Sequence, residues 1–120
     1  MNNNTQSAKQ DQANNTQMIR KINDQFRRTF FGGSVMLTSG ITSLGANAQR
    51  VILSQVREFK DFGPTNDPHG EHDFGSFAYQ GETIIFKIDY YDASLTMGSN
   101  DPADISITKR VLTILLADEW

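Results

Sequence analysis

A single β-hairpin constrains the fold of this chain more than any other stretch of its sequence. Residues 74–79 (FGSFAY) and 83–91 (TIIFKIDYY) are rich in aromatic and β-branched residues, which favour strands. The Gln80-Gly81 step between them is typical of a two-residue hairpin turn, because glycine adopts a positive φ without steric cost. The sequence therefore predicts two antiparallel strands whose register is set by this turn.

The predicted register assigns side chains to the two faces of the hairpin. Alternation puts four large apolar side chains on one face, which we expect to be the core face: Phe77, Ile84, Phe86 and Ile88. The same register, extended toward the N-terminus, places His72 opposite Asp89, where the carboxylate would favour the charged imidazole. A β-bulge at Gly75 would break this pairing.

Two helices and two further strands are expected around the hairpin. A helix over residues 17–30 is predicted by an apolar residue at every fourth position: Met18, Ile22, Phe26 and Phe30. A second helix is expected over residues 46–59, and strands over 34–38 and 105–116. Together they predict an α+β fold, in which two amphipathic helices pack on one face of a small, mainly antiparallel sheet.

The first sixteen residues differ in composition from the rest of the chain. Residues 1–16 are rich in Asn and Gln and almost lack large apolar side chains, so they offer little buried surface to offset the entropy of ordering. We therefore expect a disordered tail over residues 1–16 and a single α+β domain over residues 17–120.

The composition excludes several classes of function. The chain has no cysteine, which excludes disulfides, a thiolate nucleophile and a cysteine-based zinc site. It has no apolar run long enough to span a bilayer, and its first thirty residues lack the apolar stretch of a signal peptide. We expect a soluble cytoplasmic protein with no cofactor and no membrane partner.

Charge is divided unevenly along the chain. Residues 1–60 carry eight basic and three acidic residues, whereas residues 61–120 carry three basic and eleven acidic ones. Either basic helices lie against an acidic sheet within one domain, or the second half presents an acidic face to a partner.

A loop before the hairpin holds both histidines among carboxylates. If a metal binds, we expect its ligands to come from Asp67, His69, Glu71 and His72. If the chain is an enzyme, we expect the catalytic residues to be His69, His72, Asp73 and Asp89. Pro68 and Gly70 indicate a loop, unlike a helical zinc motif. The alternative is that these side chains only bond backbone amides and each other.

Two binding surfaces remain to be considered. Nucleic acid would have to contact the basic residues of the first helix, Arg20, Lys21, Arg27 and Arg28, although the acidic second half makes a broad phosphate footprint unfavourable. A protein partner would contact an aromatic residue beside exposed acids, for which the candidates are Tyr91, Asp89, Asp92, Asp101 and Asp104.

Four motifs carry a resemblance to a known family: NDPHGEHDFG, KIDYYD, a GSNDPAD loop and RVLTILLADEW. Residues 22–120 resemble small bacterial proteins, common in alphaproteobacteria and on plasmids, that contain a domain of unknown function. The resemblance implies a mobile-element setting. Our first hypothesis is a non-enzymatic protein-binding module, for example an inhibitor of a host defence complex such as a CRISPR effector. The alternatives are a metal-assisted hydrolase or nuclease, and a nucleic-acid binder.

Overall fold

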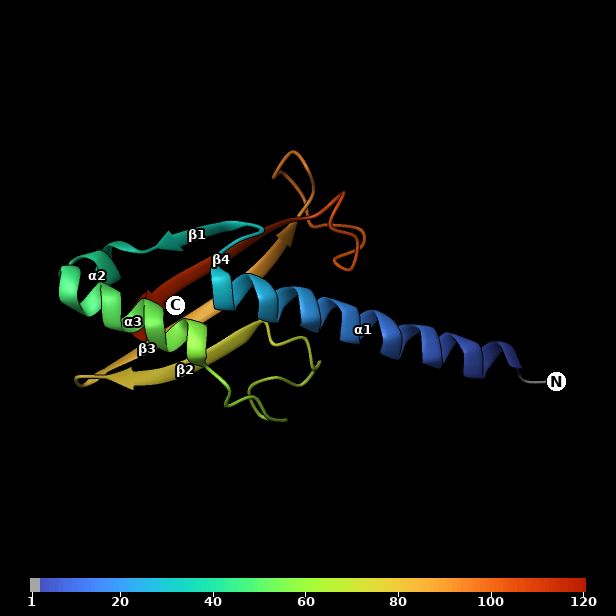
Figure 1. Cartoon of the computed structure of the whole chain (residues 1–120), viewed down its shortest axis with the longest axis horizontal. Coiled ribbons are helices and arrows are strands. Elements are labelled where there is room, and N and C mark those ends of the chain that lie inside the picture. The colour runs from blue at the N-terminus through green and yellow to red at the C-terminus, as the bar shows by residue number, and fades with distance from the viewer. Residues whose placement is uncertain (1–2) are drawn as a thin grey trace.

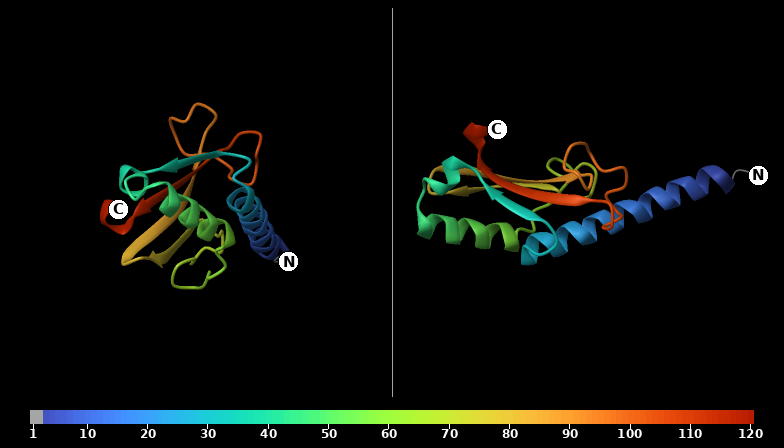
Figure 2. Two further views of the ribbon diagram at one scale, coloured as in Figure 1. Left: turned by 60° about the vertical axis from the view of Figure 1, so that its left-hand side comes forward. Right: turned by 90° about the horizontal axis from the view of Figure 1, so that it is seen from above.

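The computed structural model describes residues 3–120, and residues 1 and 2 lie outside the described residues. Four strands form one mixed sheet in the order β1-β4-β3-β2 (Figure 1): β1 (Ser34–Leu37), β2 (Phe74–Tyr79), β3 (Glu82–Tyr91) and β4 (Lys109–Leu116). Only the β1–β4 pair is parallel. The helices α1 (Asn3–Thr29) and α3 (Ala46–Glu58) lie on one face of the sheet (Figure 2). The predicted α+β fold with a mainly antiparallel sheet is therefore confirmed.

The hairpin has the predicted register. Phe77 pairs with Ile84 and Gly75 with Phe86. Gln80 and Gly81 both have positive φ, at 47° and 84°, as a type I′ turn requires. The strand has no bulge at Gly75, where a Cβ would overlap the Phe86 ring and lie 2.8 Å from the Phe59 ring. Glycine at this position gives the two rings the space to pack on the strand.

The core lies between the sheet and the helices. Its fully buried side chains come from the helix-facing side of β3 and β4 and from α1, α3 and the short helix α2 (Ser39–Thr42): Phe26, Ile41, Ile52, Val56, Ile84, Phe86, Leu112 and Ile114. Burying each such side chain contributes roughly 1.5–3 kcal/mol. Ile84, Phe86 and Ile88 lie on the core face as predicted, and the partly buried Phe77 packs against them.

The first helix differs from the prediction in its length. It begins at Asn3, whereas the sequence predicted a helix over residues 17–30. Extending an anchored helix costs less free energy than nucleating a new one, so a polar segment can continue α1 without a buried face. Residues 8–15 are exposed, and this part of α1 projects beyond the sheet (Figure 2).

The first helix also differs in the face that it buries. Its buried residues are Ile19, Asn23, Phe26 and Arg27, whereas Met18 in the predicted stripe is 48% exposed. Two of the four are polar: Asn23 donates to the Glu71 carbonyl in the loop before β2, and Arg27 donates to the Val56 carbonyl in the last turn of α3. The apolar pattern alone therefore predicted a helix face rotated away from the one that packs.

The start of β4 also differs from the prediction. β4 begins at Lys109 and not at residue 105, because the Asp104 carboxylate accepts a hydrogen bond from the Ser106 amide and holds a turn there. A 3-10 helix, η1 (Ala117–Glu119), follows β4. Across residues 3–120, every helix is too short or too polar to cross a bilayer.

Candidate functional site

A buried arginine fastens α1 to the end of α3. The Arg27 side chain is fully buried, and its guanidinium lies 5.0 Å from the centre of the Phe62 ring. Its Nε donates to the Val56 carbonyl at 3.1 Å, and Nη2 donates to the Phe59 carbonyl at 3.1 Å. Nη1 donates to Asp24 Oδ1 at 2.9 Å. Arg27 thus bonds the Phe59 carbonyl just beyond α3 and gives a second donor to the Val56 carbonyl, which also accepts the Phe59 amide at 3.3 Å.

His72 completes this first cluster from the loop before β2. Its Nδ1 lies 2.9 Å from Asp24 Oδ1, and its Nε2 lies 3.6 Å from Asp67 Oδ2. The imidazole stacks on the Phe62 ring with centroids 3.9 Å apart. Burial opposes ionisation of Asp24, but hydrogen bonds from Arg27 and His72 outweigh it and lower the pKa of that carboxyl. Both imidazole nitrogens therefore face carboxylates.

The predicted pair of His72 and Asp89 does not form. The strand begins at Phe74, and His72 has a φ of 56°, so its side chain leaves the plane that the strand register would give it. Asp89 Oδ2 lies 3.0 Å from Lys87 Nζ on the face of the sheet that turns away from α1. The register of a hairpin fixes side-chain direction only as far as the backbone stays extended.

A second polar cluster centres on Asn23, which is fully buried. Its Nδ2 donates to the Glu71 carbonyl at 3.0 Å and to the Tyr90 hydroxyl at 2.7 Å, and its Oδ1 accepts from Arg110 Nε at 2.7 Å. Tyr90 donates to Glu71 Oε1 at 2.7 Å. Burial and this carboxylate raise the pKa of the Tyr90 phenol, so the phenol keeps its proton and remains a donor.

These two clusters fasten the loop of residues 61–73 to α1. Throughout the described chain, every buried side-chain nitrogen or oxygen has a hydrogen-bond partner. Within residues 3–120, the structure forms no group of three or more His, Asp or Glu side chains arranged to hold a metal ion. Asp67, Glu71 and His72 lie in the clusters, whereas His69 is exposed. The arrangement stabilises the fold without leaving an unpaired base beside a nucleophile.

The candidate catalytic residues lie in different surroundings. His72 and Asp73 are on the side of the sheet that faces α1, and Asp89 is on the opposite side. Asp73 is partly buried beside Glu71, and its carbonyl accepts a hydrogen bond from the Ile88 amide. These positions do not bring the four side chains together around one cleft.

The candidate partner-binding acids divide into two groups. Asp92, Asp101 and Asp104 lie in the loops at one end of the sheet, where each carboxylate accepts a backbone N–H: from Thr96 at 3.1 Å, Ala103 at 3.1 Å and Ser106 at 2.9 Å, respectively. The Thr96 amide lowers the pKa of Asp92, and the Ser106 hydroxyl and amide lower the pKa of Asp104, so both carboxylates stay charged. Asp89 and Tyr91 instead lie on β3, facing away from the helices.

No long helix covers that side of the sheet, which we call the outer sheet face. Figure 2 shows the C-terminal turn there, opposite α1 and α3. Alternation along the strands places these side chains on it: Met36, Phe74, Ser76, Ala78, Ile85, Lys87, Asp89, Tyr91, Val111, Thr113 and Leu115. Trp120 is 68% exposed, and its ring meets Phe74 edge to face at 5.7 Å. Apolar, aromatic and charged groups therefore share this surface.

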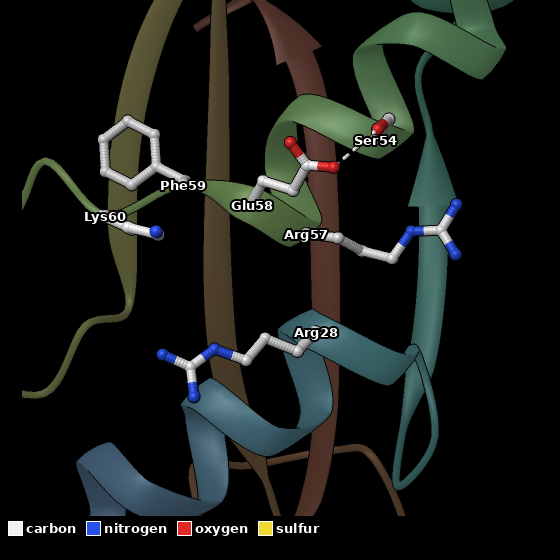
Figure 3. Close-up of a pocket in the computed structure, with 6 residues that line it drawn as sticks. All are labelled: Arg28, Ser54, Arg57, Glu58, Phe59 and Lys60. Atoms are coloured by element: carbon white, nitrogen blue, oxygen red, sulfur yellow. Dashed lines mark hydrogen bonds between the residues drawn. The ribbon is translucent and has the colours of Figure 1, made fainter.

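The opposite side of the molecule has a shallow basic hollow between α1 and the end of α3 (Figure 3). Arg28, Arg57 and Lys60 line it together with Glu58, which accepts a hydrogen bond from Ser54. The Arg57 guanidinium is directed toward the Phe30 ring at 4.9 Å. Of the first-helix cations that the sequence singled out, Arg27 is buried and unable to contact a ligand.

Sequence reasoning missed most members of the polar clusters. The sequence did not single out Asp24, Asn23 and Arg110, because the contacts that place them in the clusters are long-range. Asp24 contacts His72, Asn23 contacts the Glu71 carbonyl and Arg110 contacts Asn23, each 48 or more residues apart in the chain. One signal was available. Ile19, Asn23 and Arg27 follow one another at intervals of four residues, and Phe26 lies beside them on the same helix face. A search for a helix face that allowed polar residues would have identified these four buried positions.

Asp73 gives a pH-dependent prediction for this region. Burial and the neighbouring Glu71 raise the pKa of Asp73, so the folded state favours the neutral carboxyl. Its favourable contribution is complete below the unfolded pKa of about 3.9 and is lost as pH rises through the folded pKa. We expect D73N to raise the melting temperature at pH 7 by about 2 °C or more, with no gain near pH 3. Calorimetry at both pH values measures this.

The matched control for this experiment is D61N, which makes the same change at an exposed carboxylate. It should leave the melting temperature within about 1 °C at both pH values. A lower melting temperature of D73N at pH 7 would contradict the assignment of a destabilising charge at this position.

Comparison with known proteins identifies one family. A family model described as "Protein of unknown function (DUF3768)" matches residues 37–119, which include β2, β3 and β4 and the loop with both histidines. No curated protein and no solved structure matches the chain.

Proposed function

The chain belongs to the DUF3768 family, and on that premise we propose that it is a non-enzymatic protein-binding module whose contact surface is the outer sheet face. The observation that carries the proposal is the combination of large exposed side chains on this face. Met36 is 56% exposed and Trp120 is 68% exposed, and both flank strands that no long helix covers. Protein interfaces are enriched in aromatic residues and methionine.

The polar clusters support a non-enzymatic role. Arg27 uses its hydrogen-bonding groups to join α1 to the end of α3. Asn23 and His72 join α1 to the loop of residues 61–73. Catalysis by acid-base chemistry needs a group free to exchange a proton with substrate in a cleft. The hydrolase or nuclease alternative has less support, because Asp89 lies across the sheet from His72.

Charge favours a partner with a basic surface. Asp89 lies on the outer sheet face, and Asp92 and Asp104 follow in loops at its end, where lowered pKa values keep the two loop carboxylates ionised. A protein surface that binds nucleic acid has the complementary charge. Two parts of this proposal, the bacterial mobile-element setting and a host defence target such as a CRISPR effector, rest on the sequence resemblance. The cytoplasmic location rests on the apolar pattern of the sequence.

Site-specific photocrosslinking combined with a charge substitution tests the contact surface. A photoreactive amino acid at Met36 should crosslink to one protein in producing cells, whereas the same amino acid at Met18 of α1 should not. With that partner purified, we expect M36R to weaken binding by about tenfold or more, because the new cation replaces an apolar anchor and repels a basic surface. Calorimetric titration measures the dissociation constants.

Met18 provides the matched control for this substitution. It is 48% exposed on α1, similar to Met36, and M18R adds the same charge away from the outer sheet face. We expect M18R to bind within about twofold of the parent. Equal affinity of M36R and the parent, or crosslinking only from position 18, would contradict the proposed surface.

Nucleic-acid binding is the second candidate, and one observation favours it. Arg28, Arg57 and Lys60 surround the hollow in Figure 3, where a phosphate could contact more than one cation. It ranks second because Glu58 lines the same hollow and Arg27 is buried. Retention on DNA or RNA that falls steeply with salt and is lost in R28E would favour this candidate instead.

A further inference from the structure

The edge strand β2 has none of the features that usually protect a sheet edge. It ends the strand order at one side of the sheet, is six residues long and pairs with β3 without a bulge. Its sequence, FGSFAY, contains no charged residue and no proline. Proteins ordinarily protect such edges with charges, prolines, bulges or a covering loop, because a bare edge pairs with other strands.

The backbone of β2 offers a row of groups that point away from the sheet. The Ile88 amide donates to the Asp73 carbonyl at 2.8 Å, which fixes the alternation of hydrogen-bonded pairs along the hairpin. The N–H and C=O groups of Phe74, Ser76 and Ala78 therefore point outward. Among the described residues, no loop or terminus supplies them with a backbone partner. These three residues, at every second position of β2, can form backbone hydrogen bonds with a further strand.

We infer that β2 pairs antiparallel with β2 of a second copy of this chain, with Ser76 opposite its own counterpart on a two-fold axis. In this register Phe74 lies opposite Ala78, and Gly75 lies opposite Phe77. Each large side chain thus meets a small one. Because β2 has no charged residue, the pairing brings no like charges of β2 together. Because β2 complements itself in this register, pairing with a second copy of β2 in a two-fold homodimer is favoured over pairing with a strand of another protein.

The other edge of the sheet is a poorer site for such pairing. β1 is only four residues long and pairs parallel with β4. A hollow between Ser34 and the loop that carries Leu95 and Ile105 lies beside its start. Pairing through β2 joins the two sheets into one eight-stranded sheet and presents the outer sheet face twice. The dimer does not depend on the proposed partner.

Light scattering after size-exclusion chromatography of the full chain tests the dimer. We expect a mass near twice the 13.5 kDa of one chain. S76K places two like charges together on the axis, and we expect it to raise the dimer dissociation constant by about tenfold or more. S76P removes an outward-pointing amide without removing a bond to β3, and should have a similar effect.

The matched control is S34K, the same substitution at an exposed serine on the other edge strand. It should leave the dimer intact. A monomeric parent at all concentrations would overturn the inference, as would a dimer that S76K and S76P leave unchanged or that S34K dissociates. If circular dichroism shows that S76K is unfolded, the mass of S76P tests the dimer instead. Hydrogen exchange gives a direct reading, because the amides of Phe74, Ser76 and Ala78 should be protected only in the dimer.

Monomerisation and loss of partner binding are separable results. A monomeric S76P variant that still crosslinks from position 36 supports both the dimer and the protein-binding proposal. A parent that is monomeric but binds its partner overturns only the dimer, and a dimer that binds no protein overturns only the proposed function.

Discussion

Replacing Arg27 by methionine is expected to lower the free energy of unfolding by about 3 kcal/mol or more. The substitution removes a fully buried guanidinium and leaves the Phe59 carbonyl without its donor. The Val56 carbonyl keeps only the Phe59 amide, at 3.3 Å. It also removes one of the two hydrogen bonds that hold Asp24 ionised. Because domains of this size are stable by only about 5–15 kcal/mol, the variant should show a clear loss in urea unfolding followed by circular dichroism.

The neighbouring residue gives the control for this prediction. Arg28 is exposed, so R28M should change stability by no more than about 0.5 kcal/mol. R27K keeps the charge, but an ammonium group cannot reproduce the geometry of the three hydrogen bonds that the Arg27 guanidinium donates. We therefore expect R27K to be destabilised less than R27M but more than R28M. A loss below about 1 kcal/mol in R27M would show that water replaces the arginine at both carbonyls, contrary to its structural role.

Local sequence chemistry predicted the hairpin, because every signal for it lies within a few residues. The Gln80-Gly81 turn sets the register, and alternation then puts Ile84 and Phe86 in the core. The mainly antiparallel sheet of an α+β fold was predicted by the same reasoning. These features need no knowledge of where the rest of the chain packs.

Features that depend on distant contacts could not be predicted in this way. The face that α1 buries is selected by Asn23 and Arg27, whose partners lie in the loops before β2 and after α3. His72 was expected to pair across the hairpin, but its positive φ directs it toward Asp24 of α1. Alternation along a strand cannot predict side-chain directions in a loop, where each φ and ψ is set by separate contacts.

The clusters also explain how a small sheet holds a long loop of carboxylates and histidines. Asp67 is 8% exposed, and its Oδ1 accepts the His72 amide at 3.1 Å. The loop therefore has its own hydrogen bonds and three attachments to α1, through Asp24, through Asn23 and through Arg20, which donates to the Gly70 carbonyl at 3.2 Å. Loss of the Asp24 or the Asn23 attachment should destabilise the loop and α1 together.

Asn23 is the test of the second attachment, and N23L is expected to lower the free energy of unfolding by about 3 kcal/mol. Leucine has a similar volume but leaves the Glu71 carbonyl and Arg110 Nε without their partners in a buried site. The Tyr90 hydroxyl keeps its bond to the Glu71 carboxylate and loses the amide donor. Chemical unfolding of N23L at pH 7 measures the loss.

Asn15 serves as the matched control, since N15L makes the same substitution at an exposed position of α1. It should keep stability within about 0.5 kcal/mol, because the side chain stays in water in both states. The double variant N23L with R110M removes both partners of the 2.7 Å bond. It should be less destabilised than the sum of the two single variants, because the second substitution also removes the charge that the first leaves unpaired. Additive losses would mean that Asn23 and Arg110 stabilise the fold independently.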